Sequence, residues 1–587
     1  MKQLLTGNEA IARGFLEAGG KFASGYPGTP STEIMENISK YDSIYSEWAP
    51  NEKVAIESAI GAAFVGGRSI AVMKHVGLNV AADPLFTLSY TGVNAGLVIV
   101  SADDPGMHSS QNEQDNRYYS KFSKIPMLEP SDSQEAKNFV KLAFKISEDF
   151  DTPVLIRLTT RVCHSKSLVS IDEPENIEFK QYIKSNKFDP IPKISRLLHK
   201  KVEERLIDLE KYSNKIDVNY TEFNEDKKIG VITSGISYQY AKEVFGDTVS
   251  YFKLGMTFPL PFDKLLEFSK QVDNIYVIEE LDPFIEEQLK SHGIDCIGKE
   301  KLPNLYELNP SIIRNAFLGT SLDTVTSNVK SKNTNLTFCA GCPYRAFFYE
   351  LSKLKNVIIS SDIGCYSLSG SEPFYAKDIA ICMGAGFSIA HGIDKMLSMS
   401  NSNKKCIGIL GDSTFFHSGM NSLLNASYNK SNSLFIILDN RSTSMTGFQE
   451  NPGTCKTLKN EKSPDIKIEN IVKALGITNL KIVDPLNLEE LRDSLNWGLN
   501  IHEPCVIIAR SPCILKDDSI NITSTKYSCI DQSKCIKCKK CLNIACPAIS
   551  IDETKNEIII NKDICKDCNL CKQLCPNKAI ISKEVIK

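Results

Sequence analysis

The sequence has little excess charge of either sign, and it lacks a long uninterrupted hydrophobic run. Its 587 residues carry 68 Lys and Arg against 71 Asp and Glu, a net charge of −3. Without a basic excess, neither nucleic acid nor a membrane is an expected partner. No window approaches the roughly 18 apolar residues of a membrane-spanning helix, and the opening MKQLLTGNEAIARGF lacks an apolar core of signal-peptide length. We therefore expect a cytoplasmic protein.

The composition is otherwise that of a large globular chain, with 42% hydrophobic and 24% charged residues. At about 150 residues per domain, the length predicts roughly four domains. No solenoid-type repeat is visible. The unusual component is cysteine, of which there are 19. Because the chain is long, lacks a secretion signal and clusters many of these cysteines, they indicate metal binding rather than disulfides.

Two cysteine runs near the C-terminus, CIKCKKCLNIACP and CKDCNLCKQLCP, have the spacing of iron–sulfur ligands. They resemble the two-cluster bacterial ferredoxin pattern, in which the fourth Cys of each run ligates the other cluster. The resemblance implies two 4Fe-4S ligand sets: Cys535, Cys538, Cys541 and Cys575, and Cys565, Cys568, Cys571 and Cys546. The first run has one extra residue before its last Cys. Zinc sites are the alternative, since CxxC pairs also bind zinc.

A second motif lies in residues 405–443. The apolar runs CIGIL and LFIIL flank a segment of helical spacing, which predicts a strand–helix–strand unit of a parallel sheet. Gly411, Asp412 and Ser413 end the first strand and Asn440 follows the second, so Asp412 and Asn440 offer oxygens to one hard cation. The GD-to-DN spacing resembles the diphosphate motif of thiamine diphosphate enzymes. This resemblance implies Asp412, Asn440 and the Ser442 carbonyl as Mg²⁺ ligands.

Thiamine enzymes also need a carboxylate that protonates the aminopyrimidine ring. APNEKVAIESAIGAAFVGG places two acids at the head of an Ala/Gly-rich helix. Glu52, nine residues before Gly61, has the placement of the activating Glu in this superfamily, whereas Glu57 lies only four before it. The alternative role for Glu52 is to complement the helix dipole. Met383, in ICMGAGFSIAHG, is placed where related enzymes put an apolar side chain under the cofactor, although a core Met is equally ordinary.

The combination of SGYPGTPSTEI, MKHVGLNVAADP, SADDPGMHSSQNEQD, IRLTTRVCHS, GDSTFFHSGM and the cysteine runs resembles the alpha subunits of indolepyruvate:ferredoxin oxidoreductases. The resemblance extends from about residue 5 to 580 and is weak only over 171–227. It implies oxidative decarboxylation of an aryl 2-oxoacid with coenzyme A, giving aryl-acetyl-CoA, CO₂ and two electrons for ferredoxin. Thiamine and iron–sulfur clusters in one chain likewise favour oxidation over simple decarboxylation.

The expected fold class is α/β, with parallel sheets flanked by helices and a C-terminal α+β ferredoxin domain. The predicted parts are a pyrimidine-binding domain, a charged linker containing a surface helix, a domain resembling the transketolase C-terminal domain, a diphosphate- and Mg²⁺-binding domain, and a two-cluster ferredoxin domain. Their ranges are 1–170, 171–227, 228–325, 332–515 and 525–587.

Four further cysteines resemble the ligands of the cluster nearest thiamine in pyruvate:ferredoxin oxidoreductases: Cys339, Cys342, Cys365 and Cys513. They predict a third cluster, the alternative being ordinary core cysteines. Thr29, in GYPGTP, matches a threonine that holds the oxoacid carboxylate in these relatives, or is a turn residue. His75, His108 and His417 lie in matched motifs as candidate proton shuttles, or are simply hydrogen-bonded.

The resemblance also implies partners: a separate beta subunit, ferredoxin, coenzyme A and a dimer of alpha subunits. Indolepyruvate, phenylpyruvate and hydroxyphenylpyruvate stay open as substrates, and no coenzyme A motif is found. Two other functions stay open. One is a non-oxidative thiamine-dependent decarboxylase with structural clusters, and the other is an electron-transfer protein with a degenerate thiamine fold.

Overall fold

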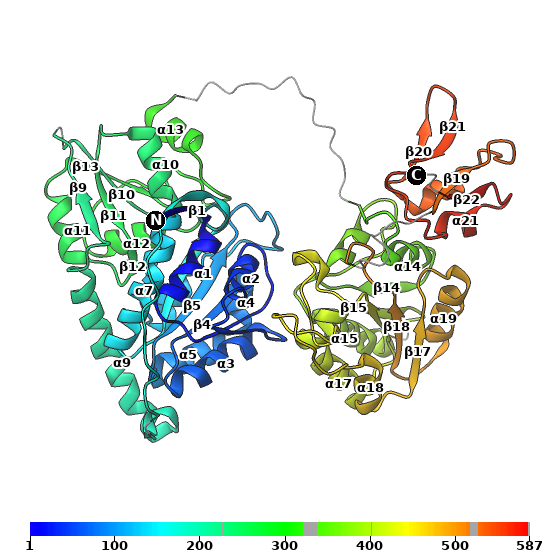
Figure 1. Cartoon of the computed structure of the whole chain (residues 1–587), viewed down its shortest axis with the longest axis horizontal. Coiled ribbons are helices and arrows are strands. Elements are labelled where there is room, and N and C mark those ends of the chain that lie inside the picture. The colour runs from blue at the N-terminus through cyan, green and yellow to red at the C-terminus, as the bar shows by residue number, and fades with distance from the viewer. Residues whose placement is uncertain (183, 226, 321–336, 401, 517–525, 585–587) are drawn as a thin grey trace. The chain divides into compact units, whose positions relative to one another are not determined.

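The computed structural model describes residues 1–182, 184–225, 227–320, 337–400, 402–516 and 526–584. The chain divides into two compact units, residues 1–328 and 329–587, and each is described by itself (Figure 1). The predicted domain boundaries at 325, 332, 525 and 587 lie outside the described residues.

The first unit is built on a seven-stranded sheet with the order β12-β6-β7-β5-β4-β2-β3. Every neighbouring pair is parallel except β12 and β6. The strands are β2 Phe22–Gly25, β3 Tyr45–Trp48, β4 Ser69–Lys74, β5 Leu97–Asp103, β6 Met127–Leu128, β7 Val154–Thr159 and β12 Met256–Phe258. The sequences LVIVSAD and VLIRLT are buried at every position, as expected for strands covered on both faces.

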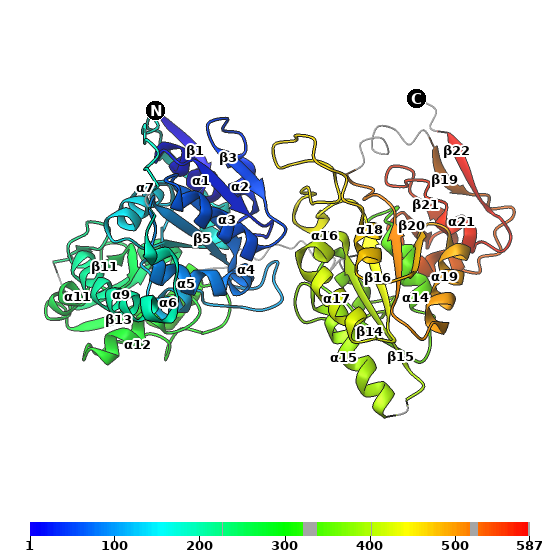
Figure 2. The ribbon, with the colours of Figure 1, turned by 90° about the horizontal axis from the view of Figure 1, so that it is seen from below.

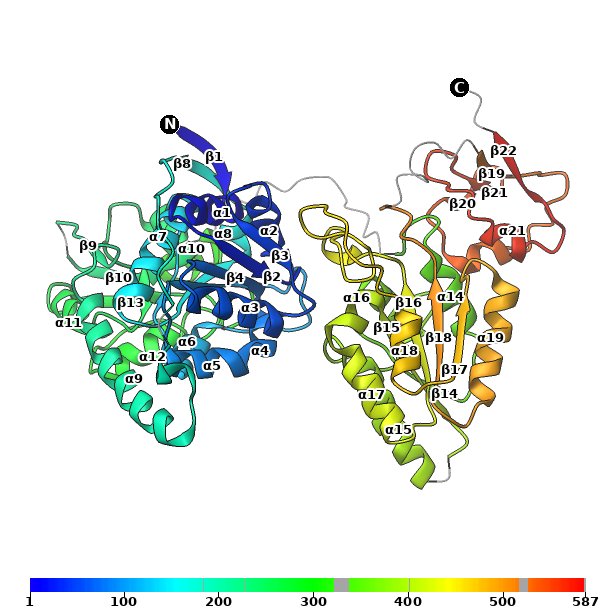
Figure 3. The same cartoon turned by 60° about the horizontal axis from the view of Figure 1, so that its bottom comes forward.

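Helices cover both faces of this sheet, with α3 and α5 on one side and α1 and α7 on the other (Figure 3). The helices of this part are α1 Gly7–Glu17, α2 Thr32–Ile38, α3 Glu52–Phe64, α4 His75–Val80, α5 Ala82–Thr91, α6 Arg117–Ser123, α7 Ser133–Asp149 and α8 Thr160–His164. A small antiparallel pair, β1 Lys2–Thr6 with β8 Lys166–Ser170, closes one end. The parallel α/β architecture expected from the sequence is confirmed here.

A four-stranded sheet follows in the same unit, with the order β13-β10-β11-β9. Its strands are β9 Tyr220–Glu222, β10 Ile229–Ser234, β11 Ser250–Leu254 and β13 Asn274–Ile278, and its helices are α10 Gly235–Phe245, α11 Phe262–Ser269, α12 Phe284–Ser291 and α13 Pro310–Leu318. Strand β12, from the predicted range 228–325, pairs with β6 in the first sheet. One core cluster contains residues of both ranges, such as Ile99 and Phe252. The two predicted domains therefore share a sheet edge and a core.

The charged segment 171–227 contains the long helix α9, Pro192–Ser213, preceded by the turn Asn186–Phe188. Most of its residues are exposed, as expected for a surface helix. It packs along α5, where Arg205 donates to the Ser89 carbonyl and the rings of Tyr90 and His199 are 5.4 Å apart. The linker is therefore anchored to the first domain.

The second unit contains a five-stranded parallel sheet with the order β14-β15-β16-β18-β17. Its strands are β14 Val357–Ser360, β15 Lys405–Gly411, β16 Leu434–Asp439, β17 Asn479–Val483 and β18 Cys505–Arg510. Its helices are α14 Pro343–Leu351, α15 Ala385–Met399, α16 Asp412–Thr414, α17 Met420–Tyr428, α18 Ile468–Ala474 and α19 Leu488–Asn500. The predicted strand–helix–strand unit is confirmed as β15, α17 and β16.

Alternate residues along these strands enter two different cores. In β16, Ile436 and Leu438 pack with α14 and α19, whereas Phe435 and Ile437 pack with α15, α17 and α18. The two helical layers lie on opposite sides of the sheet (Figure 2). Successive side chains of a strand point to opposite faces, and both faces of this sheet are covered by helices. The strands are therefore apolar at nearly every position.

The C-terminal segment consists of two antiparallel strand pairs and two short helices. Strand β19, Lys526–Ile530, pairs with β22, Ile580–Glu584, and β20, Ile549–Asp552, pairs with β21, Glu557–Ile560. The two short helices, η5 Lys540–Ile544 and α21 Leu570–Leu574, contain the third cysteine of each CxxCxxC run, Cys541 and Cys571. Its core includes Ala346 of α14 and Leu488 of α19, so this segment packs against the five-stranded sheet's helices.

Candidate functional site

The carboxyl ends of β15 and β16 bring the predicted diphosphate motif together. The strands are parallel neighbours, and Asp412 and Asn440 are the residues that follow them. Asp412 is 2% exposed and accepts hydrogen bonds from the Ser442 N–H and the Asn451 Nδ2, both at 3.1 Å. Gly411 donates its N–H to the Tyr366 hydroxyl at 3.0 Å, which fixes the start of the turn.

Three oxygen atoms converge at this edge in one orientation of the Asn440 amide. Its oxygen then lies 2.9 Å from the Ser442 carbonyl oxygen and 3.2 Å from Asp412 Oδ1, while its nitrogen donates to Ser444. Without a cation, hydrogen bonding favours the other orientation, in which the nitrogen donates to both oxygens and the amide oxygen accepts from the Ser444 and Tyr344 hydroxyls. Three facing oxygens repel each other unless a proton or a cation lies between them, and such a set is what Mg²⁺ prefers. The residues therefore fit a hard cation in the first orientation.

Electrostatics at Asp412 point the same way. Burial and the carboxylate of Asp439 raise the pKa of Asp412 to about 7, against the hydrogen bonds from Asn451, Ser413 and Ser442. Asp439 itself is held by Arg510, whose Nε lies 2.6 Å from Oδ2. A divalent cation would supply the charge that stabilises the ionised Asp412 carboxylate.

The loop before α15 is tied to a buried acid that the sequence reasoning missed. Asp362, fully buried, accepts hydrogen bonds from the backbone of Gly384 at 3.0 Å and Gly386 at 2.8 Å. The half-buried Met383 lies in this loop, and its carbonyl accepts from the Ser418 hydroxyl at 3.3 Å. Gly384 has φ 91°, and a Cβ there would lie 1.8 Å from Ser418 Oγ, so only glycine fits. The available signal was an Asp directly after an apolar strand, VIISSD.

In the first unit, Glu52 is the first residue of α3, after the N-cap Asn51. Glu52 is 6% exposed, whereas the Glu57 side chain is 46% exposed and paired with Lys53 at 2.9 Å. A Cβ on Gly77 would lie 2.6 Å from Glu52 Oε1, so glycine is needed for the carboxylate to occupy its place. Burial and close packing favour Glu52 over Glu57 as the functional acid.

A half-buried lysine, also absent from the predicted set, lies near this acid. Lys74 donates to the Ser109 carbonyl at 2.9 Å and the Ser110 hydroxyl at 2.8 Å. Burial lowers its pKa to about 8, against the attraction of Asp104 and Glu52. A Cβ on Gly28 would lie 3.0 Å from the Lys74 side chain, which brings the loop of the half-buried Thr29 close to it.

The three candidate histidines differ in environment. His75 is fully buried, its Nε2 lies 3.2 Å from the Asn112 carbonyl, and burial lowers its pKa to about 4. The half-exposed His108 lies 3.3 Å from Glu307. His417 is buried in the π-helical turn after Asp412, with Nδ1 2.9 Å from the Ser418 hydroxyl. His417 is therefore the one attached to the diphosphate motif.

Two small cavities in the C-terminal segment are each lined by four cysteines. One is lined by Cys535, Cys538, Cys541 and Cys575, and the other by Cys546, Cys565, Cys568 and Cys571. Burial and three neighbouring thiols of the second cavity raise the pKa of Cys571 to about 12. Within the described segments, no three His, Cys, Asp or Glu side chains are grouped closely enough for a single metal ion. A four-iron cluster spreads its ligands around a larger body, and four sulfurs around one cavity fit it.

The four upstream cysteines also lie near one another. Burial together with Cys339 and Cys365 raises the pKa of Cys342 to about 12, and burial together with Cys513 and Cys339 raises that of Cys365 to about 11. The Cys513 N–H donates to the Asn440 carbonyl at 3.0 Å. This cysteine group therefore adjoins the Asp412–Asn440 edge of the sheet.

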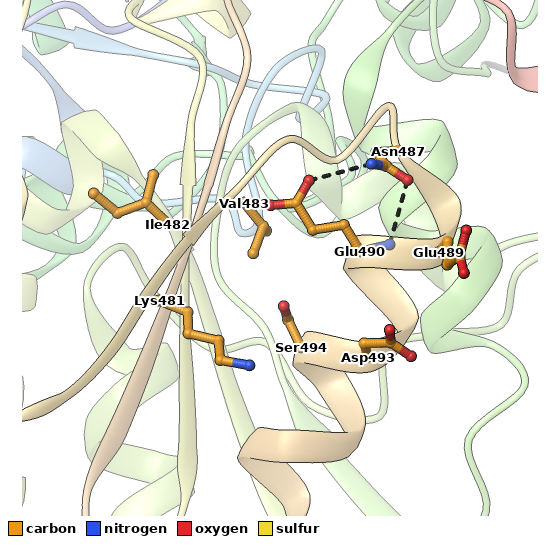
Figure 4. A pocket seen from close by; sticks show the side chains of 8 residues that line it. All are labelled: Lys481, Ile482, Val483, Asn487, Glu489, Glu490, Asp493 and Ser494. Atoms are coloured by element: carbon orange, nitrogen blue, oxygen red, sulfur yellow. Dashed lines mark hydrogen bonds between the residues drawn. The ribbon is translucent and has the colours of Figure 1, made fainter.

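A further hollow lies on the surface at the start of α19, and Figure 4 shows its lining. Asn487 caps the helix there by accepting from the Glu490 N–H at 3.3 Å. None of the predicted site residues lines it. The acids in the first turn, Glu489 and Glu490, have an ordinary role in complementing the helix dipole.

Comparison with known proteins agrees with this geometry. The family "Pyruvate flavodoxin/ferredoxin oxidoreductase, thiamine diP-bdg" matches residues 13–216. "Thiamine pyrophosphate enzyme, C-terminal TPP binding domain" matches residues 362–509. The first match covers Glu52 and the second covers Asp412 and Asn440. The fold and these matches define the class as thiamine diphosphate-dependent 2-oxoacid oxidoreductases.

The relatives narrow the class. "Indolepyruvate oxidoreductase subunit IorA" of Archaeoglobus fulgidus is 38% identical over 99% of this chain and 97% of its own. The protein of the same name from Pyrococcus abyssi is 38% identical over 98% and 96%. The chain belongs to the family of indolepyruvate:ferredoxin oxidoreductase alpha subunits.

A solved 2-oxoglutarate:ferredoxin oxidoreductase from Magnetococcus marinus has a TM-score of 0.45 and 15% identity, covering 54% of this chain and 64% of that one.

Among the described residues, no helix has the length and apolar character that crossing a membrane requires.

Proposed function

We propose that this chain is the catalytic subunit of a cytoplasmic enzyme that oxidises aryl 2-oxoacids of the indolepyruvate type. One oxoacid, one coenzyme A and two oxidised ferredoxins give aryl-acetyl-CoA, CO₂, a proton and two reduced ferredoxins. The observation that carries the proposal is the 3.0 Å hydrogen bond from Cys513 N to the Asn440 carbonyl. It joins the oxygen set that fits Mg²⁺ to the cysteine group that would receive electrons.

The diphosphate of the cofactor would be held through Mg²⁺ by Asp412, Asn440 and the Ser442 carbonyl. When bound, thiamine diphosphate supplies the nucleophilic carbon and accepts the electron pair that CO₂ leaves behind. The Asp412 carboxylate neutralises part of the cation's charge, and Asp362 holds the loop of Met383 in the shape that the cofactor would contact. Both roles use buried hydrogen bonds already present in the chain.

Glu52 would exchange a proton with the ring nitrogen of the aminopyrimidine. Its burial at the start of α3 limits water around the carboxyl, which favours transfer to a bound partner over transfer to solvent. Thr29 would donate a hydrogen bond to the oxoacid carboxylate. The nearby Lys74 ammonium would strengthen that anion's binding, because a half-buried cation with a lowered pKa is stabilised by a further negative charge.

The three cysteine groups would each hold a 4Fe-4S cluster and carry single electrons outward to ferredoxin. In this proposal the range 1–170 binds the pyrimidine, 332–515 the diphosphate and 525–587 the two outer clusters. A separate beta subunit and a second copy of this chain complete the enzyme. Coenzyme A would bind at residues other than those named above.

The decisive experiment is anaerobic reduction of ferredoxin by the purified alpha–beta pair, with a panel of 2-oxoacids and coenzyme A. We expect reduction that requires both substrates and is fastest with aryl oxoacids. Release of free aldehyde without an electron acceptor would instead support a non-oxidative decarboxylase. Failure of the protein to bind thiamine diphosphate would support an electron-transfer protein.

A further inference from the structure

Arg345, in the first turn of α14, is a fully buried cation between two of the cysteine groups. It is 1% exposed and follows Cys342 by three positions. One terminal nitrogen donates to the Ile544 carbonyl at 2.7 Å and to the Ala545 carbonyl, in the turn just before Cys546. The other donates to the Phe338 carbonyl and, at 3.2 Å, to the Cys339 carbonyl. One guanidinium thus ties the CAGC loop to the C-terminal segment.

The surroundings of this guanidinium lack a matching anion. Among the described residues, no carboxylate lies within ion-pair distance of Arg345, and its buried Nε has no hydrogen-bond partner. Burial lowers the pKa of the Arg345 guanidinium. The neighbouring sulfurs that favour its ionised form are those of Cys546, Cys342, Cys568 and Cys339. A buried cation needs a counter-charge, and a buried N–H needs an acceptor.

Arg345 lines a cavity that could hold both a counter-charge and a hydrogen-bond acceptor for it. Arg345 and Gly341 line it together with Cys546, Cys565, Cys568 and Cys571, and Lys566 is a second cationic residue of the lining. A Cβ on Gly341 would lie 2.9 Å from the Lys566 side chain, so the CAGC loop approaches this cavity closely. The other four-cysteine cavity is lined, apart from its cysteines, by Ile530, Ile536, Ile558, Asn577, Ala579 and Ile580, none of them charged.

We propose that Arg345 sets the reduction potential of the two clusters on either side of it and fixes which one the electrons reach next. This rests on the proposed function, because it requires clusters at the three cysteine groups. A positive charge stabilises the more negative, reduced cluster and so raises its potential. The cluster of Cys546, Cys565, Cys568 and Cys571 then receives electrons from the upstream group. The cluster of Cys535, Cys538, Cys541 and Cys575 comes last.

The test is a redox titration of the full chain in its complex, followed by EPR spectroscopy. In Arg345→Gln, we expect two of the three one-electron transitions to shift to lower potential while the third stays unchanged. The ratio of reduced to oxidised cluster at a fixed potential should fall about tenfold, which is 59 mV for a one-electron couple. Arg345→Lys, which keeps the charge, should change this ratio by less than about threefold. As a control, Arg492→Gln removes a half-exposed arginine of α19 that pairs with Glu350 of α14, the helix of Arg345, and it should shift none of the three transitions.

Iron analysis comes first and separates this inference from the proposed function. A wild-type chain without iron at these cysteines would contradict the electron route itself. With iron present, unchanged transitions in Arg345→Gln would overturn the inference alone. An equal shift in Arg345→Lys and Arg345→Gln would also overturn it, since hydrogen-bond geometry rather than charge would then be responsible. If Arg345→Gln fails to retain iron, the test rests on Arg345→Lys. A fall of more than about threefold in its ratio of reduced to oxidised cluster would then contradict the inference.

Discussion

At the scale of single residues, Asp412 combines burial, a neighbouring carboxylate and two facing oxygens. Its substitution by Ala removes the one formal negative charge among the three proposed cation ligands. We expect Asp412→Ala to lose thiamine diphosphate and Mg²⁺ binding while keeping its iron. Calorimetry with the cofactor and iron analysis measure the two effects. Asp493→Ala, at an exposed position in the second turn of α19, is the matched control and should bind normally. Normal cofactor content in Asp412→Ala would refute the ligand set.

Glu52→Gln keeps the size and hydrogen bonding of the side chain but removes the ionisable proton. The cofactor should still bind, and turnover should fall by about a hundredfold or more, the usual scale for an acid–base group. The measurement is steady-state ferredoxin reduction together with cofactor titration. Glu57→Gln, exposed and paired with Lys53, should remain near wild type. A large loss in Glu57→Gln alone would mean that the wrong carboxylate was chosen.

Residues beside strand ends could be predicted because the local pattern places them. Asp412 and Asn440 each follow a short apolar run, and parallel strands bring such ends together. Asn451, which donates to Asp412 from 39 positions along the chain, has no such pattern. Lys74 was missed for a related reason, since its role comes from partners that only folding brings close. Asp362 did carry a local signal, an acid after an apolar strand, but its glycine partners lie more than twenty residues further on.

At the scale of elements, helix α6 joins the two sheets of the first unit through a buried ion pair. Arg117, 1% exposed, lies 2.5 Å from both Asp115 and Glu279, and it also donates to the Asp282 carbonyl at 3.0 Å. Arg117→Met would leave two buried carboxylates without their partner. We expect the free energy of unfolding to fall by about 3–5 kcal/mol, the usual cost of breaking a buried pair.

Urea unfolding followed by circular dichroism measures this loss. Lys145→Ala provides the control, because its pair with Asp149 on α7 is exposed and contributes about 0.5 kcal/mol or less. Equal midpoints for Arg117→Met and wild type would show that the pair is not needed to hold the two sheets together.

The elements with strong periodicity were predictable, and the short ones were not. Strands β15 and β16 were expected from CIGIL and LFIIL, whose alternating residues fill two cores. Strand β12 has only three residues, Met256–Phe258, and its pairing with β6 depends on an edge formed 130 residues earlier in the chain, at about Met127. Nothing local in MTF indicates which sheet it will join.

At the scale of the whole molecule, we expect the cysteine groups to set the iron content. With three 4Fe-4S clusters the purified chain should contain about twelve Fe, against about eight with two. The double variant Cys365→Ser with Cys513→Ser should drop to about eight, while its EPR signals from the C-terminal cavities persist. Cys455→Ser, a half-buried cysteine outside the three groups, should keep about twelve. A wild-type value near eight that the double variant leaves unchanged would identify the upstream four as core cysteines.

The hydrogen bond from Cys513 to the Asn440 carbonyl links the proposed cluster site to the proposed cation site, so we expect the protein's tolerance of air to depend on its cofactor. If both sites form as proposed, ordering one strand end favours the other, and such coupling is reciprocal. Chain purified with thiamine diphosphate and Mg²⁺ should therefore lose its iron to oxygen more slowly than cofactor-free chain. The bleaching rate of the visible absorption measures this protection. The cofactor would then protect the iron–sulfur clusters from oxidative loss in addition to its role in the reaction.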